Sequence, residues 1–238
     1  MAIILAEVIT VAVGPVLGII CHIILLGSLL LNSALTSEQN YQQLLLSLAL
    51  VPLIRILSLS MPLADIPQVL WYPIIYVPLM IAAFQVIRIL GFSLDQIGFN
   101  FRRIYIQLAM ALTGFLFGII EYFILAEEAE ITGLVLKETW LLSAFLLIVT
   151  TGFVEELIFR SVLQRTATQI FGNWGIVYVS LIFAFVHLIH YSLLDIGFVF
   201  VIAMFFGWVV KKTGSLVGVT LSHGVANIVL FLVAPLLF

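Results

Sequence analysis

The chain has 238 residues, of which 64% are hydrophobic and only 9% are charged. Soluble domains carry about 25% charged residues, so this composition excludes an ordinary soluble domain and indicates an integral membrane protein. The formal net charge of −3 provides no broad basic surface for nucleic acid. The single cysteine, Cys21, excludes an intramolecular disulfide and a cysteine-based zinc site.

Eight apolar segments approach the length of about 20 residues that a helix needs to cross a bilayer core. The sequence therefore predicts an all-α, polytopic membrane protein of about eight transmembrane helices. The predicted spans are residues 4–31, 41–61, 69–90, 104–125, 139–163, 174–191, 194–210 and 214–236. Several prolines in the second and third spans predict kinked or partial helices there. The first span lacks the basic residues of a signal peptide and is interpreted as retained; cleavage near residues 32–34 is the alternative.

Basic residues test this topology because they concentrate in cytoplasmic loops. One side of the eight-helix arrangement holds Arg88, Arg102, Arg103, Arg160, Arg165, Lys211 and Lys212, whereas the other holds only Lys137. This asymmetry predicts that both termini lie on the non-cytoplasmic side. The compact size of the chain favours a bacterial-type plasma membrane as the location, and an organelle membrane of bacterial descent is the alternative. Residues 92–103 mix apolar and charged positions and could form either an interfacial helix or a plain connecting loop.

The fifth predicted span contains Glu155, Glu156 and Arg160. Ionisable groups in a membrane span are costly and usually mark function. Glu156 and Arg160 are four residues apart on one helix face, so they can form an ion pair. Glu155 is rotated by about 100° from Glu156 and must find another partner, which favours a role as general base. An interfacial helix end with charges that reach water is the alternative interpretation.

Three further polar residues lie in later spans: His187 in the sixth, and His223 and Asn227 in the eighth. His223 and Asn227 are four residues apart and share a helix face, which requires a polar partner or a water-filled cavity. At about 1.5 Å per residue, all three lie at a similar depth to Glu155. The spacing predicts that these side chains meet, although His187 alone could equally be a core histidine bonded to backbone.

Small residues recur at every fourth position of the eighth span, at Gly214, Gly218, Ser222 and Ala226. Such a stripe allows two helices to approach closely, so it predicts tight packing of this span against a neighbour.

The remaining polar residues in the spans give weaker signals. Glu7 and Glu121 lie near outer helix ends, and their side chains are expected to extend toward water. His190 is interpreted as interfacial and His22 as a structural hydrogen-bonding residue. Arg55 is expected to pair with a carboxylate of another helix, which the sequence does not identify.

The four polar residues that are predicted to meet suit peptide-bond hydrolysis. Glu155 could take a proton from a water that His187 positions. His223 and Asn227 could donate hydrogen bonds to the resulting oxyanion. No serine or cysteine stands in a nucleophile motif, which favours direct attack by water. Zinc could bind a set of one glutamate and two histidines, but the ligands are scattered and no His-Glu-x-x-His motif is present, so no cofactor is expected.

The chain resembles the CPBP family, the CAAX-protease and bacteriocin-processing group also called Abi. The resemblance rests on three motifs, Glu-Glu-x-x-x-Arg at 155–160, Phe-x-x-x-His at 183–187 and His-x-x-x-Asn at 223–227. It covers roughly residues 139–232, which predicts a catalytic helical core over 139–238. Residues 1–138 are then N-terminal transmembrane helices and the interfacial segment.

The resemblance implies an intramembrane endopeptidase similar to the Ras-converting CAAX endopeptidase. Glu155 and His187 would activate water, His223 and Asn227 would form the oxyanion hole, and Glu156, Arg160 and Phe183 would support the site. The implied partner is a membrane-associated protein or peptide, with a prenylated CAAX-like substrate as one form of it. A non-catalytic scaffold, assembly or bacteriocin-immunity factor is the alternative function. A transporter is disfavoured because the sequence shows no internal repeat.

Overall fold

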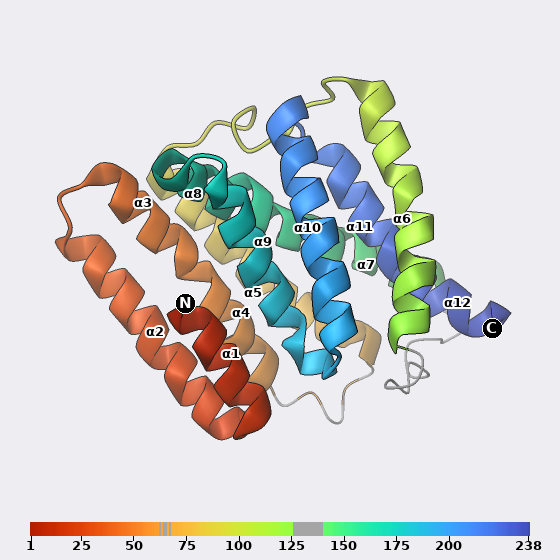
Figure 1. Ribbon diagram of the computed structural model, residues 1–238, viewed down its shortest axis with the longest axis horizontal. Helices are drawn as coiled ribbons and strands as arrows, with labels where there is room; N and C mark the ends of the chain where they lie inside the picture. Colours follow the sequence, from red (N-terminus) through yellow and green to blue (C-terminus); the bar gives the residue numbers. More distant parts are fainter. Residues whose placement is uncertain (62, 64–65, 67, 126–139) are drawn as a thin grey trace.

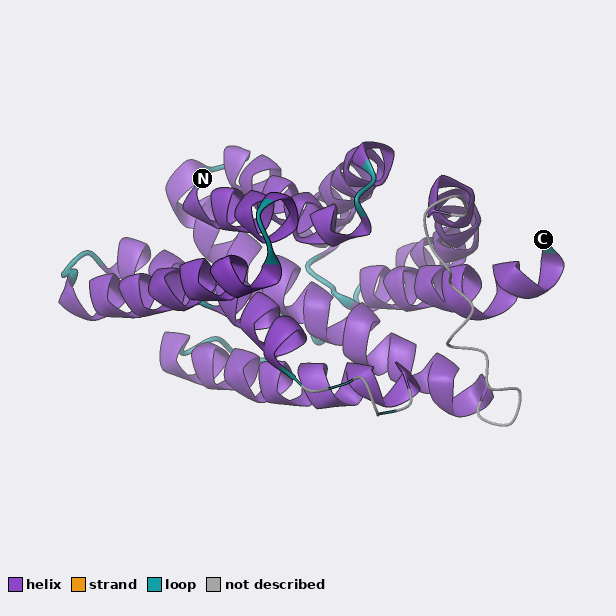
Figure 2. Ribbon diagram, turned by 90° about the horizontal axis from the view of Figure 1, so that it is seen from below, coloured by secondary structure: helices purple, strands orange, loops and turns teal. Residues whose placement is uncertain are grey.

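The computed structural model describes residues 1–61, 63, 66, 68–125 and 140–238 of the chain, and all regular structure in these residues is helical (Figures 1 and 2). The α-helices are α1 (Ala2–Ala12), α2 (Pro15–Leu35), α3 (Gln39–Leu48), α4 (Leu50–Ser60), α5 (Gln68–Leu90), α6 (Ile104–Leu125), α7 (Trp140–Leu147), α8 (Gln164–Phe171), α9 (Trp174–Val186), α10 (Leu193–Thr213), α11 (Val217–Ile228) and α12 (Ala234–Leu237). Two π-helical segments, η3 (Ile148–Glu155) and η4 (Leu157–Leu163), connect α7 to α8. A 3₁₀ turn, η5 (His187–His190), continues α9, and a third π segment, η6 (Val229–Val233), joins α11 to α12.

The membrane-spanning helices agree with the predicted class of fold. Seven helices in the described part of the chain are long and apolar enough to cross a membrane: Pro15–Leu35, Gln39–Ser60, Leu70–Leu90, Ile104–Leu125, Trp140–Phe171, Leu193–Thr213 and Val217–Leu237. The shorter apolar helix Trp174–His190 coincides with the sixth predicted span. These helices confirm the prediction of an all-α, polytopic membrane protein.

The first predicted span, residues 4–31, is wrong at its N-terminal end. Helix α1 stops after 11 residues, and α2 begins at Pro15. Gly14 lies between them with φ of 145°, a conformation that glycine adopts readily, and proline suits the first position of a new helix. Helix α1 therefore folds back beside α2 (Figure 1). A helix of this length rises only about 16 Å, which is too short to cross a bilayer.

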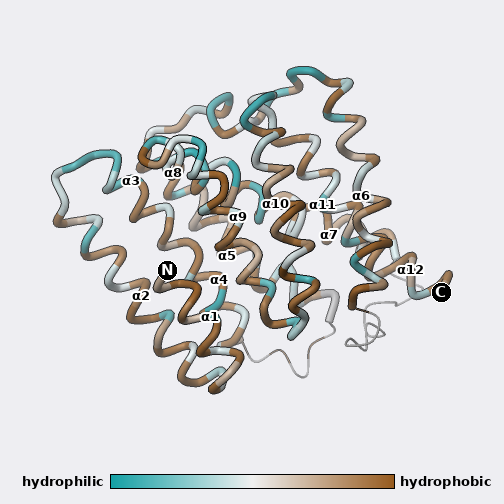
Figure 3. Tube along the Cα trace, viewed as in Figure 1, coloured by the Kyte–Doolittle hydropathy of each residue, from teal (hydrophilic) through white to brown (hydrophobic). Residues whose placement is uncertain are grey.

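The four connections that the charge asymmetry assigns to the basic side gather at one end of the molecule. The connections α2–α3, α5–α6, α8–α9 and α10–α11 all lie at the upper end in Figure 1, where Figure 3 shows hydrophilic segments. Residues 92–103 form turns and bends without a helix, so the plain-loop interpretation of this segment holds. The helices between these loops form the apolar body of the protein (Figure 3).

Helix α11 is held tightly on two sides by glycine contacts. The predicted stripe packs against α6: a Cβ added to Gly118 of α6 would meet the backbone oxygen of Ala226, and one added to Gly218 would lie 2.8 Å from the Cα atom of Gln107. On its other side, a Cβ added to Gly152 of η3 would lie 2.9 Å from the backbone nitrogen of Gly224. These close approaches fix the rotation and depth of α11, and with them the positions of His223 and Asn227.

We expect Gly118→Leu to destabilise the protein by about 1–3 kcal/mol, because the new side chain has no space between α6 and α11. Thermal unfolding in detergent measures the effect. Gly27→Leu is the matched control, since a Cβ at this exposed position of α2 meets no atom within 4 Å. Equal melting temperatures for the two variants would contradict the packing that we describe.

Candidate active site

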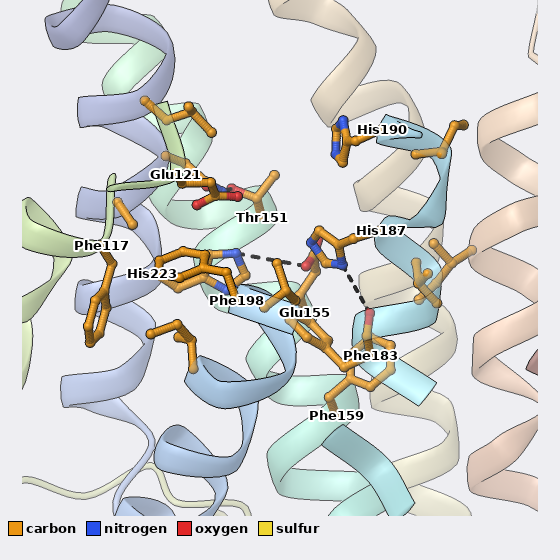
Figure 4. A pocket seen from close by; sticks show the side chains of 18 of the residues that line it. Phe117, Glu121, Thr151, Glu155, Phe159, Phe183, His187, His190, Phe198 and His223 are labelled. Atoms are coloured by element: carbon orange, nitrogen blue, oxygen red, sulfur yellow. Dashed lines mark hydrogen bonds and ion pairs between the residues drawn. The ribbon is translucent and has the colours of Figure 1, made fainter. Parts of the chain in front are cut away.

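A cavity of about 240 Å³ lies between helices from both halves of the chain. Its walls are mainly apolar and include six phenylalanine rings: Phe117, Phe159, Phe183, Phe198, Phe206 and Phe231. The four residues that the sequence predicts as catalytic, Glu155, His187, His223 and Asn227, all line this cavity (Figure 4). The structure therefore brings the four side chains together, as their similar predicted depth indicates.

Glu155 and Glu156 lie at the junction of η3 and η4, where the main chain is wound more widely than in an α-helix. Such π-helical turns are rare and often occur at functional sites. Neighbouring glutamates on a helix point in different directions, and here Glu156 is fully buried whereas Glu155 lines the cavity. The two carboxylates therefore have different surroundings and can serve different purposes.

The Glu155 carboxylate reaches the cavity between two histidines (Figure 4). The hydroxyl of Tyr76, from α5, donates a hydrogen bond to Glu155 Oε1. The second oxygen, Oε2, is 3.9 Å from His223 Nε2. This separation is too long for a direct hydrogen bond but places the two groups close enough for a favourable charge interaction.

The two carboxylate oxygens of Glu156 contact two different side chains, Arg160 and His223. Its Oε2 is 3.0 Å from Arg160 Nε, which confirms the predicted ion pair, and both side chains are fully buried. Its Oε1 is 3.0 Å from His223 Nδ1. The Arg160 guanidinium also lies over the Phe183 ring, 4.8 Å from the centroid, which adds a cation–π contact. Glu156 thus links Arg160 to His223 behind the cavity wall.

His187 lies where α9 ends and η5 begins. Its Nδ1 is 2.9 Å from the backbone oxygen of Phe183, which can only accept a hydrogen bond. Nδ1 must therefore carry the proton, and in the neutral ring Nε2 is left as an acceptor. The hydrogen bond to backbone that was the alternative interpretation of His187 is present, and the ring lines the cavity as well.

Asn227 is oriented by Thr151 of η3. Its Nδ2 donates a 2.7 Å hydrogen bond to Thr151 Oγ1, and that hydroxyl donates a 2.7 Å bond to the backbone oxygen of Leu147. Because an amide nitrogen carries two hydrogens, Asn227 keeps a second donor beside the cavity. His223 and Asn227 come from one face of α11, as their spacing predicts.

Several predictions for the other polar residues need correction. Glu7 does not extend to water: its side chain is 1% exposed and its Oε2 is 2.7 Å from Arg55 Nη2. Glu7 is thus the carboxylate partner that Arg55 requires. His22 makes no hydrogen bond to the described residues, and its Nε2 lies 3.6 Å from Glu7 Oε1. Glu121 does not extend away from the protein but points into the cavity beside Thr151 (Figure 4). The interfacial interpretation of His190 stays a prediction, and His190 also lines the cavity.

Sequence reasoning missed the contribution of the N-terminal half to this site. Tyr76, Arg55 and Glu121 come from α5, α4 and α6, before the predicted boundary at residue 138. One signal was present, because Tyr72 and Tyr76 are four residues apart in a proline-interrupted helix and share a face. The division into 1–138 and 139–238 stays a prediction, but the cavity is built from both parts.

Two of the cavity histidines, His187 and His223, each use one ring nitrogen in a hydrogen bond within the protein and keep the other nitrogen. Nδ1 of His187 bonds to a backbone oxygen, and Nδ1 of His223 bonds to Glu156. Within the described ranges 1–125 and 140–238, with the gaps near residue 65, no group of three His, Cys, Asp or Glu side chains is arranged to hold a metal ion. A carboxylate beside two histidines also suits acid–base chemistry on a water molecule.

Comparison with protein families gives one match, to the Rce1-like family, described as type II CAAX prenyl endopeptidase Rce1-like, over residues 137–229. Residues 137–229 are an Rce1-like domain. The structure describes this domain from residue 140 onward, and it contains all seven predicted site residues. Comparison with curated proteins and with solved structures gave no match. The Rce1-like domain indicates a membrane protease, and so a hydrolase of peptide bonds.

We expect Glu156→Ala to destabilise the Rce1-like domain by about 3–5 kcal/mol, because it leaves the buried Arg160 charge without its carboxylate partner. Glu156→Ala/Arg160→Met, which removes both charges, should recover most of this loss. Denaturant or thermal unfolding in detergent measures both variants. Equal stability of the single and double variants would show that the ion pair does not have the structural importance described here.

Proposed function

We propose that the protein is an intramembrane endopeptidase that hydrolyses a peptide bond of a membrane-associated substrate with water activated by Glu155 and His187. The observation that carries the proposal is the position of the Glu155 carboxylate in the cavity between His187 and His223 (Figure 4). The protease family of the domain supports the same reaction. Because Tyr76 occupies one carboxylate oxygen, the other is available to a water molecule.

In the first step, Glu155 removes a proton from water while Nε2 of His187 accepts the second hydrogen of that water and orients it. The oxygen adds to the scissile carbonyl carbon, and the carbonyl electrons move to its oxygen. His223 and Asn227 donate hydrogen bonds to this oxyanion. With Nδ1–H donated to Glu156, His223 can donate from Nε2 only when both ring nitrogens carry hydrogen, and the two neighbouring carboxylates balance the charge of that form.

In the second step, the tetrahedral intermediate collapses and the carbon–nitrogen bond breaks. Glu155 returns its proton to the departing nitrogen, which leaves as an amine, and the other product is a carboxylic acid. Protein side chains are unchanged at the end of the cycle, and the reaction consumes one water. No covalent acyl-enzyme is needed, in agreement with the absence of a serine or cysteine nucleophile motif.

The walls of the cavity support an apolar or lipid-modified substrate. The phenylalanine rings from α6, α10 and η6 give one wall a large apolar surface. A prenylated, CAAX-like peptide is the form of substrate that the family of the domain favours. The basic end of the molecule would face the cytoplasm of a bacterial-type plasma membrane, with both termini assigned to the non-cytoplasmic side, according to the positive-inside rule.

The decisive experiment compares peptide termini in membranes from cells with the wild type, a deletion, Glu155→Ala and Glu155→Gln. We expect termini that occur only with the wild type, because either substitution removes the base that activates water. These termini would also identify the substrate and the cleavage position. If Glu155→Gln, inserted stably, matches the wild type in termini and phenotype, the protein is a scaffold, assembly or immunity factor instead.

We also expect cleavage to be insensitive to metal chelators, because the proposed steps use only protein side chains and water. Purified protein would be incubated with 1,10-phenanthroline and with EDTA, and the cleavage of a substrate identified above would be measured. A zinc peptidase assayed in parallel checks that the chelators act under the same conditions. Loss of activity that added zinc restores would overturn the metal-independent mechanism.

A further inference from the structure

The ion pair between Glu7 and Arg55 lies beside the cavity and joins parts of the chain outside the Rce1-like domain to the end of α9. Arg55 Nε donates a 2.8 Å hydrogen bond to Glu7 Oε2, and Nη2 of the same guanidinium donates a 2.6 Å bond to the backbone oxygen of Val186. Val186 is the last residue of α9 and directly precedes His187. The guanidinium therefore connects α1 to the turn that carries His187.

The main chain changes its winding at this point. Helix α9 ends at Val186, and residues His187–His190 continue as a 3₁₀ turn. The last carbonyl groups of an α-helix lack their usual partners, and a cation at this end also interacts favourably with the helix dipole. Arg55 supplies both a charge-assisted donor and a positive charge to this helix end.

Arg55 is itself held in place by helix α1. Its side chain is 5% exposed, and the side chain of Glu7 is 1% exposed, so each charge depends on the other. Glu7 can reach Arg55 because α1 folds back at Gly14 and contacts α9 and η5. Gly18 permits this fold, since a Cβ there would lie 2.8 Å from the backbone of Thr10.

We propose that Arg55, held by Glu7 of the folded-back helix α1, is a positioning residue that fixes His187 in the cavity by capping the C-terminal end of α9. The proposal rests on the proposed function for its effect on catalysis. It assigns a purpose to α1, a helix too short to cross the membrane that lies outside the Rce1-like domain. Displacement of a catalytic group by about 1 Å can reduce a rate by about 100-fold, so a fixed η5 matters for turnover.

The test uses a pair of changes that leaves no buried charge unpaired. Glu7→Gln/Arg55→Met removes the ion pair and the donor to Val186 together, whereas Arg55→Lys keeps a charged donor. We expect the double variant to fold and insert normally, with kcat reduced by about 10- to 100-fold and KM changed little. Arg55→Lys should retain most of the wild-type kcat. The control Glu38→Gln/Arg88→Met makes the same chemical changes at exposed positions and should behave as wild type.

A second measurement separates this proposal from the proposed function. In the catalytically inactive Glu155→Ala background, hydrogen–deuterium exchange of residues 187–191 should be at least about 10-fold faster with Glu7→Gln/Arg55→Met, while α10 and α11 remain unchanged. Because this measurement does not depend on cleavage, we expect the same result even if the protein proves not to be a protease. A folded double variant with wild-type exchange at 187–191, or with wild-type kcat in an active protease, overturns the proposal.

Discussion

The low-dielectric interior of the membrane requires each ionisable group to have a partner, and the whole site depends on how this requirement is met at Glu156. Its carboxylate contacts Arg160, which lies behind the cavity wall, on one side and His223, which lines the cavity, on the other. A charge left unpaired here would cost several kcal/mol. Because Glu156 satisfies Arg160, the neighbouring Glu155 is free to face the cavity. The two adjacent glutamates therefore have different surroundings, which suits the separate structural and chemical roles proposed for them.

Close helix packing makes this arrangement rigid. Glycines on α6 and η3 allow their backbones to contact α11 from two sides, so His223 and Asn227 cannot rotate away from Glu155 without a clash. In lipid there is little hydrophobic force between helices, and contacts of this kind supply much of the attraction. The same small residues that permit close approach thus also determine the geometry of the candidate oxyanion donors.

The N-terminal half completes a site that the family match alone would place in residues 137–229. Tyr76 donates to Glu155, and Arg55 binds the carbonyl that precedes His187. Both contacts cross from helices before residue 91 to the Rce1-like domain. Because these contacts hold Glu155 and the turn that carries His187, we expect that residues 137–229 alone would not reproduce the site.

The sequence by itself determined the helical class, the approximate spans from the second onward and the four polar residues of the C-terminal half that meet in the cavity. The length of the apolar segments, the uneven distribution of basic residues and the four-residue spacing of polar residues can all be read from the sequence. The four-residue spacing also predicted the Glu156–Arg160 pair, since both partners lie on one helix face. The tertiary structure decided what local patterns cannot encode. It divided the first span at Gly14, paired Glu7 with Arg55 across 48 positions and brought Tyr76 to Glu155 across 79. These contacts depend on how separate helices pack, because nothing near either partner in the chain identifies the other.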